Sequence, residues 1–248
     1  MIAVIGAASP AGAALCRAIK QQGRPFVPVV RNAAHWIFTS ITTEAVFADI
    51  EDSPVLARRL EGAEIVVHCG PARFVPAVLA AAPEGARFLL LGCVKDGTSA
   101  EAFRASGRAG TMLRTSAIYG TGVLDDRVQS LAATLQKDPL VTLPEGVAQP
   151  IHLADLSACL LAALDSLGDA PEVIDVAGPA ALPMAEFLAA VARAAGAPPP
   201  RTGSVLLDRM PFRTKLAATE IAALAQPVAT DIAPMQARFS LTPRPFAA

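Results

Sequence analysis

The residues with the clearest chemical meaning form a turn of small side chains, with Gly6 and Gly12 at its ends and Ser9 midway. The turn follows the apolar run 2–5 and precedes residues at helical spacing. A helix N-terminus offers unpaired N–H groups and partial positive charge, so a pyrophosphate fits there. Ser9 replaces the usual middle glycine and restricts backbone approach. The turn predicts dinucleotide binding; the alternative is an α/β fold with an empty crevice.

The end of the second apolar run, residues 26–30, bears on the type of cofactor. Arg31 and Asn32 stand there, and no carboxylate follows until Glu44. A carboxylate at this position binds the ribose hydroxyls of NAD, whereas an arginine accommodates the 2′-phosphate of NADP. The sequence therefore favours NADP over NAD. The plainer interpretation is that Arg31 is a solvated residue at a strand end.

Strand-like and helix-like segments alternate through the chain at intervals of about 25 residues, which indicates βαβ units. We therefore expect an α/β protein with a doubly wound parallel-sheet Rossmann fold and a small C-terminal lobe. The expected strands cover residues 2–5, 26–30, 64–68, 87–91, 110–114 and 172–176. The expected helices cover residues 53–60, 74–82, 99–106, 126–136, 153–164 and 183–195, with one more that leaves the glycine turn and stops at Gly23. Ser53 is the expected N-cap of its helix, and 96–98 an expected turn.

The domain organisation follows from this alternation. We expect an NAD(P)-binding Rossmann domain over residues 1–178 and a C-terminal helical or irregular lobe over 179–248, the two packed as one unit. Three prolines, 198–200, interrupt the chain before an irregular, proline-rich tail. The tail forms either a small lobe over a site or an extension that follows the surface.

The composition excludes several classes of protein. The 248 residues are 53% hydrophobic and 17% charged, which excludes a disordered chain. The net charge is −1, whereas a nucleic-acid or membrane-surface protein shows a basic surplus, so we expect neither partner. The four cysteines form no CxxC pair, so no metal site is expected. No signal peptide is visible, and we expect a cytoplasmic protein.

Several segments in order resemble the extended and atypical short-chain dehydrogenases/reductases, the NAD-dependent epimerase/dehydratase and NmrA-like group. The glycine turn resembles the family's opening turn. The other matching segments are 48–50 (ADI for GDL), 62–70 (GAEIVVHCG for GADVVVHLAA), 112–120 (MLRTSAIYG for ILRPSxIYG), 149–156 (QPIHLADL for xPIHVDDL), 173–178 and 184–188. The resemblance covers residues 1–196.

The resemblance implies a cofactor site at the carboxyl ends of the strands, with Asp49 against the adenine amine. The implied cofactor-binding residues are Gly6, Ala8, Ser9, Pro10, Ala11, Gly12, Arg31, Asp49, Ile50, Cys69, Gly70, Pro71 and Gly92. NADP is the expected cofactor and NAD the second candidate.

The catalytic residues of that family are missing. The family uses a tyrosine with a lysine four residues later, because a nearby cation lowers the phenol pKa toward neutrality. The one tyrosine, Tyr119, lies in the IYG segment, and Val123 stands four residues on. Residues 93–110, where the pair belongs, contain Lys95 but no tyrosine and have room for only a short helix. The catalytic residues stay unknown.

Other polar groups could act in place of the missing pair, and each has a structural interpretation as well. They are Cys93 beside Lys95 as a reactive thiol, His68 as an acid or base, His152 with Asp155 as a polar couple, and Arg114 as a substrate ligand. Each is more typical of core packing, of a strand–helix turn or of support for the fold.

These observations predict an NAD(P)-binding oxidoreductase or epimerase-like protein whose small-molecule substrate is unknown. The alternative is a non-catalytic NADP(H)-binding redox sensor or assembly subunit; a third option, prompted by Ser9, is a protein that has lost its cofactor. The short helix expected at 99–106 cannot fill the family's dimer bundle, so we expect a monomer or an atypical dimer. We also expect Gly6→Val to abolish cofactor binding without unfolding the protein.

Overall fold

A computed structural model describes residues 1–120, 127–137, 140–141, 144–202, 221–222 and 224–246. Contacts group the chain into two compact units, and neither unit is continuous in sequence. The first contains residues 1–115, 156–175 and 234–241; the second contains 116–155, 176–233 and 242–248. The expected domain division at residue 178 stays a prediction.

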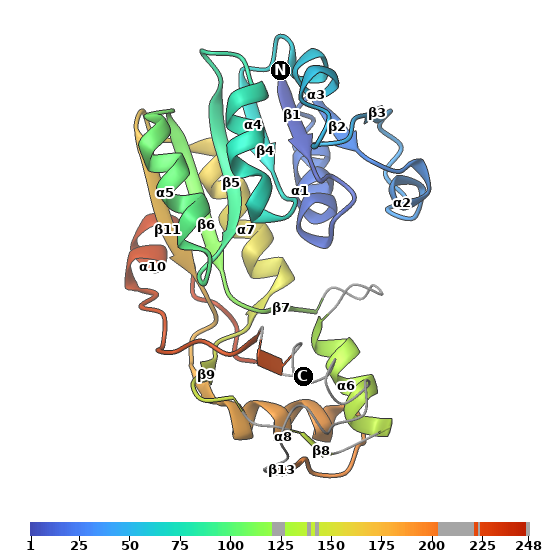
Figure 1. The fold of residues 1–248 in the computed structure, drawn as a ribbon, viewed down its shortest axis with the longest axis vertical. Coiled ribbons are helices and arrows are strands. Elements are labelled where there is room, and N and C mark those ends of the chain that lie inside the picture. Colours follow the sequence, from blue (N-terminus) through green and yellow to red (C-terminus); the bar gives the residue numbers. More distant parts are fainter. Residues whose placement is uncertain (121–126, 138–139, 142–143, 203–220, 223, 247–248) are drawn as a thin grey trace. The chain divides into compact units, whose positions relative to one another are not determined.

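The first unit is built on a seven-stranded sheet (Figure 1). Its strands are β1 Ile2–Ile5, β2 Phe26–Val30, β3 Val46–Phe47, β4 Ile65–His68, β5 Arg87–Cys93, β6 Gly110–Thr115 and β11 Pro171–Val176. Their order is β11-β6-β5-β4-β1-β2-β3, and every pairing from β3 through β6 is parallel. The order reverses between β1 and β4. In open α/β sheets, ligands bind beyond the carboxyl ends of the strands at such a switch point.

Helices cover both faces of this sheet (Figure 1). α3 Ser53–Leu60, α4 Val75–Ala81 and α5 Gly97–Ser106 pack against one face and share a buried core with the strands. α1 Pro10–Gln21 and α7 Leu153–Asp165 lie on the other, where Arg24, just after α1, pairs with Asp165. The expected doubly wound α/β Rossmann fold is therefore confirmed.

Helix caps account for three differences from the expected elements. The N-cap of α3 is Asp52 rather than Ser53, because the Asp52 carboxylate accepts the Val55 N–H at 3.1 Å. Asp96 caps α5 in the same way, so residues 97–98 form its first turn instead of a separate turn. Asn32 caps α2 Ala33–Ile37, a helix in a stretch that had no assignment. Its cap was the signal that could have revealed it, since Asn is a preferred N-cap residue.

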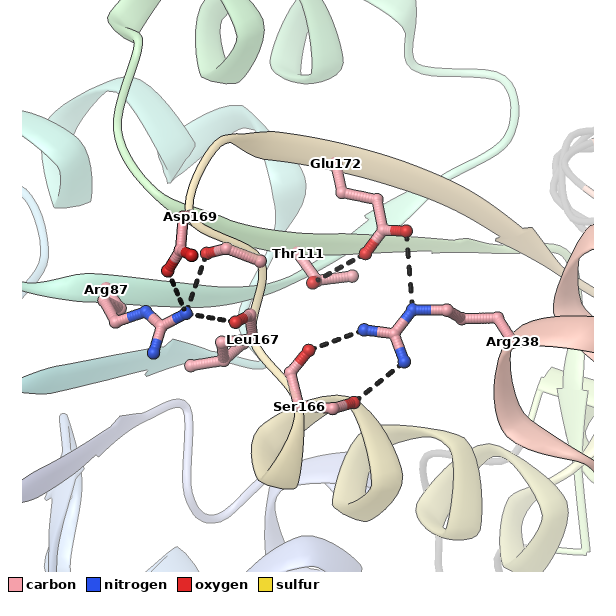
Figure 2. A network of polar contacts seen from close by, with 8 residues as sticks. Arg87, Thr111, Ser166, Leu167, Asp169, Glu172 and Arg238 are labelled. Carbon is pink, nitrogen blue, oxygen red and sulfur yellow. Dashed lines mark hydrogen bonds and ion pairs between the residues drawn. The ribbon is translucent and has the colours of Figure 1, made fainter.

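Two arginines fix the loop between α7 and β11 at the amino ends of the strands (Figure 2). Arg87 donates to the carbonyl oxygens of Leu167 and Gly168 and pairs with Asp169 at 3.0 Å. Arg238, on α10 Ala233–Phe239, donates to Ser166 and pairs with Glu172 at 3.5 Å. The C-terminal helix α10 is thereby joined to the first unit.

The second unit has a core of its own, in which α6 Arg127–Lys137 packs on α8 Met184–Ala194. Its short strands are β7 Ile118–Tyr119, β8 Leu140–Val141, β9 Val147–Ala148, β10 Ile151–His152, β12 Leu182–Pro183 and β13 Arg201–Thr202. Asp126 and Val123 lie outside the described residues. Within the described part of the chain, no helix is long and apolar enough to cross a membrane.

Candidate functional site

The glycine turn lies between β1 and α1, where the sheet order reverses. Gly6 has φ +72°, and a Cβ there would lie 2.7 Å from the Gly70 nitrogen in the loop after β4. A Cβ on Gly12 would lie 2.2 Å from the Gly6 carbonyl oxygen. Both glycines are therefore required by contacts between backbone segments. The expectation that Gly6→Val spares the fold is wrong, because valine would meet backbone atoms that cannot move aside.

Ser9 links the first turn of α1 to the loop after β4. Its hydroxyl accepts the Gly12 N–H at 3.1 Å as the N-cap of α1 and donates to the Cys69 carbonyl oxygen at 2.9 Å. Its backbone is extended, with φ −68° and ψ 158°, a conformation that needs no glycine. The serine thus costs no backbone strain in this turn.

The first turn of α1 presents few donors to a ligand. Pro10 has no N–H, the Gly12 N–H is bonded to Ser9, and the first intrahelical bond runs from Ala13 N–H to the Ser9 carbonyl. The N–H of Ala11 has no intrahelical acceptor at this position. Together with the helix dipole, it is the group of this turn that suits a phosphate oxygen. Ala8, half-buried, precedes Ser9 in the same turn.

The loop after β4 lies against the glycine turn at the switch point. Cys69 N–H donates to the Ile5 carbonyl at 2.9 Å, and His68 Nε2 lies 3.2 Å from the Pro71 carbonyl oxygen. A Cβ on Gly70 would lie 2.8 Å from His68 Cε1, so a side chain here would displace the buried imidazole. Burial lowers the pKa of His68 to about 4 and raises the pKa of Cys69 to about 12. Both groups are neutral at pH 7, which suits a structural role.

Arg31 and Asp49 stand at the ends of the next strands. Arg31 is exposed, and within the described residues it makes no hydrogen bond or ion pair. Asp49 is exposed and accepts the Glu51 N–H at 3.1 Å, beside an open hollow of about 550 Å³. Acidic side chains dominate that hollow, so it repels phosphate and suits a group that donates hydrogen bonds. Ile50 packs against the core of the first unit.

The carboxyl end of β5 carries Gly92 and Cys93. Gly92 is buried, and a Cβ there would lie 3.4 Å from both Met112 Sδ and Arg114 Cγ. Cys93 is a free, half-buried thiol. Arg114 donates two hydrogen bonds to the Asp175 carboxylate, at 2.6 and 2.8 Å. This bidentate pair commits Arg114 to the contact between β6 and β11.

Two candidate residues of the second unit, Tyr119 and Asp155, are bonded to its C-terminal segment. Tyr119 is buried, its hydroxyl donates to the Pro245 carbonyl at 3.0 Å, and its ring packs against His152. Asp155 pairs with Arg244 at 2.9 Å, so the structure gives it a partner other than His152. Burial, with Arg244 as a smaller cause, lowers the pKa of His152. Tyr119 and Asp155 thus hold chain segments together.

Comparison with protein-family models finds no match. The chain is 29% identical to the ceramide reductase of Caulobacter vibrioides over 191 residues, which cover 65% of this chain and 60% of that protein. The match therefore spans about three fifths of the relative's length.

Solved structures share the fold over nearly the whole chain. One is a nucleoside-diphosphate-sugar epimerase from Staphylococcus aureus, 17% identical with a TM-score of 0.73, covering 98% of this chain and 97% of that one. Another is a quinone oxidoreductase from Escherichia coli in complex with NADPH, 17% identical with a TM-score of 0.72, covering 99% and 96%. At such low identity the likeness establishes the Rossmann fold.

Proposed function

We propose that the first unit binds a nicotinamide dinucleotide across the switch point between β1 and β4. One observation carries the proposal: the β1–α1 turn lies in backbone contact with the β4 loop, and the N-terminus of α1 opens at their junction. Ala11 N–H would bind the pyrophosphate, and Gly70 with Pro71 would line the cofactor. A quinone oxidoreductase of like fold has been solved in complex with NADPH, which supports a nicotinamide dinucleotide as the ligand.

NADP is the favoured cofactor. Arg31 follows β2 and has no partner among the described residues, so its guanidinium is available to a 2′-phosphate. Asn32 is engaged as the cap of α2, and no carboxylate stands at this strand end to bind a ribose diol. An arginine with no competing carboxylate favours the phosphorylated ribose.

Reduction of a carbonyl group is the favoured reaction class, and a carbonyl on a long-chain amphiphile is the first substrate to screen. The name of the ceramide reductase relative supports this choice. The bound nicotinamide would supply hydride, while this chain supplies position and a site that excludes water. α5 carries no tyrosine, so the proton would come from a group outside the usual pair or from water.

A non-catalytic cofactor-binding protein is the second candidate, and the use of Tyr119 favours it. The sole phenol of the chain is bonded to Pro245 and enclosed by rings. We also propose a monomer, or a dimer that does not use α5, because this helix has only 10 residues. Light scattering tests the mass, and a dimer bundle built on α5 would contradict the proposal.

Titration calorimetry with NADPH and NADH tests the site. A charge-assisted contact is worth roughly 1.5–3 kcal/mol, so Arg31→Ala should weaken NADPH binding by about 10-fold to 150-fold and leave NADH nearly unchanged. Arg104→Ala, an exposed arginine on α5, is the matched control and should change neither affinity. Equal losses for both cofactors, or no loss, would contradict the assignment of Arg31. A hydride-transfer screen with long-chain carbonyl compounds then separates the reductase from the non-catalytic binder.

A further inference from the structure

The segment from α2 to β3 exposes large apolar side chains. Ile37 is 74% exposed and Phe38 is 83% exposed, and Phe47 on β3 is 48% exposed. In the part of the chain that the structure describes, the other exposed large hydrophobic residues are Met1, at 37%, and Val228, at 71%. Ile37 and Phe38 are adjacent, and we call them the apolar tip.

The apolar tip is held outward by neighbours that are anchored beneath it. Trp36 is buried, and its indole N–H donates to the Thr43 carbonyl at 3.0 Å. The Thr39 hydroxyl donates to the Trp36 carbonyl at 2.7 Å, and Ile41 is buried in turn. Ser40 has φ +57°, a conformation that non-glycine residues seldom adopt. The fold therefore maintains two exposed apolar side chains on a built turn.

Two cations of α1 lie against the same turn. Arg17 donates to the Thr39 carbonyl oxygen at 3.1 Å, and the Lys20 ammonium donates to the Thr42 hydroxyl. Arg17 and Lys20 are both exposed residues. The segment 33–47 contains one carboxylate, Glu44, so this segment and the two cations together carry a net charge of +1; the next carboxylates in the chain, from Asp49 to Asp52, line the hollow beyond β3.

We propose that the apolar tip, with Arg17 and Lys20 beside it, docks on an anionic lipid surface. A stable protein interface needs about 800 Å² from each partner, which two side chains cannot supply. An aromatic and an aliphatic side chain flanked by cations suit insertion at the boundary between headgroups and acyl chains. We expected no membrane partner from the net charge of −1, but that value is a sum over the whole chain and does not report the local excess of positive charge beside the tip.

Docking would serve the proposed reductase, because a long-chain amphiphile resides in a membrane. The surface itself needs no cofactor, so it is tested separately from the nucleotide site. Sedimentation with vesicles of phosphatidylcholine, with and without phosphatidylserine, measures it. We expect the wild-type protein to bind vesicles that contain phosphatidylserine, with binding that weakens as salt is added.

The double variant I37S/F38S should reduce partition into these vesicles by about tenfold to a hundredfold, because each apolar side chain loses its transfer from water. Val228→Ser, an isolated and 71% exposed apolar residue of the second unit, is the matched control and should leave partition unchanged. The replaced side chains are exposed, so circular dichroism should show a folded variant.

Three results would overturn the proposal: no vesicle binding by the wild type, equal binding by I37S/F38S, or binding indifferent to phosphatidylserine. Self-association of the wild type that I37S/F38S abolishes in light scattering would assign the tip to a second copy instead. NADPH affinity, measured on the same variants, should not change. If the wild-type protein binds vesicles but not NADPH, the proposed function is contradicted and the docking surface is not.

Discussion

The central sheet has one edge at the amino ends of its strands and another at their carboxyl ends, and these two edges use polar residues in opposite ways. At the amino ends of the strands, Arg87 and Arg238 bond to carbonyls and a carboxylate of the loop between α7 and β11 and to Glu172 on β11 (Figure 2). At the carboxyl ends, Arg31 makes no described contact and Ala11 has an N–H without an intrahelical acceptor. The guanidinium groups of the first edge bond mainly within the chain, although Arg87 Nε is buried without a partner, whereas the second edge offers donors to a ligand.

This difference separates residues that stabilise the fold from residues that are available to a ligand. An arginine whose hydrogen bonds are made within the chain gains little from a substrate, whereas an unpaired arginine at a strand end can bind a phosphate at no cost to the fold. The carboxyl edge is not wholly open, because Arg114 is committed to Asp175. Variants at the two edges should therefore separate changes in stability from changes in affinity.

The largest effect is expected at Gly12, which belongs to the carboxyl edge yet serves the fold. In Gly12→Ala the new Cβ would meet the Gly6 carbonyl oxygen, and we expect a loss of about 4 kcal/mol or more in the free energy of unfolding. Urea denaturation measures it. Gly97→Ala, where a Cβ meets nothing within 4 Å, is the control and should change stability by less than about 0.5 kcal/mol. A stable Gly12→Ala protein would show that the turn is looser than described.

His68 should make stability depend on pH. Its pKa is about 4 in the folded protein, below the ordinary value of 6.5, because the imidazole is buried. As the pH falls from 6.5 toward 4, the unfolded chain binds a proton that the folded protein does not, so stability decreases, by about 3 kcal/mol in total. Urea denaturation at pH 7.5 and 4.5 measures the loss. His68→Gln should flatten this dependence, and an unchanged slope would exclude His68 as its source.

Arg87→Ala probes the edge at the amino ends of the strands. It removes donors from two backbone carbonyls and one carboxylate, and we expect a loss of about 2 kcal/mol in unfolding free energy. The NADPH affinity of the folded variant should match that of the wild type in calorimetry. Arg31→Ala should give the reverse pattern, lower affinity with unchanged stability. If Arg87→Ala weakened NADPH binding as much, the contrast between the edges would be lost.

The smallest effect is expected at Ser9. Because its backbone already adopts an ordinary extended conformation and its hydroxyl turns toward Cys69, Ser9→Gly should change NADPH affinity by less than about threefold. Glycine is a tolerable N-cap, so the loss of stability from capping should be a few tenths of a kcal/mol. A large gain in NADPH affinity would show that Ser9 obstructs the pyrophosphate.

Local patterns predicted most of the fold. The expected strands at 2–5 and 26–30 match β1 and β2, and the expected helix at 153–164 differs from α7 by one residue. Glycine placement was equally informative, because Gly12 is explained by its contact with Gly6. The N-caps of α3 and α5 were predicted less well, because the residues beside Asp52 and Asp96 suit a cap or a turn equally well.

The sequence by itself determined the α/β alternation, the glycine turn and the absence of a tyrosine from the segment before β6, because each of these lies within a few neighbouring residues. Only the tertiary structure decided which polar groups are occupied. Ser9 meets Cys69 across 60 positions, Arg114 meets Asp175 across 61, and Tyr119 meets Pro245 across 126. Such pairs form only when packing brings distant segments together, and the packing depends on the whole chain rather than on any local pattern.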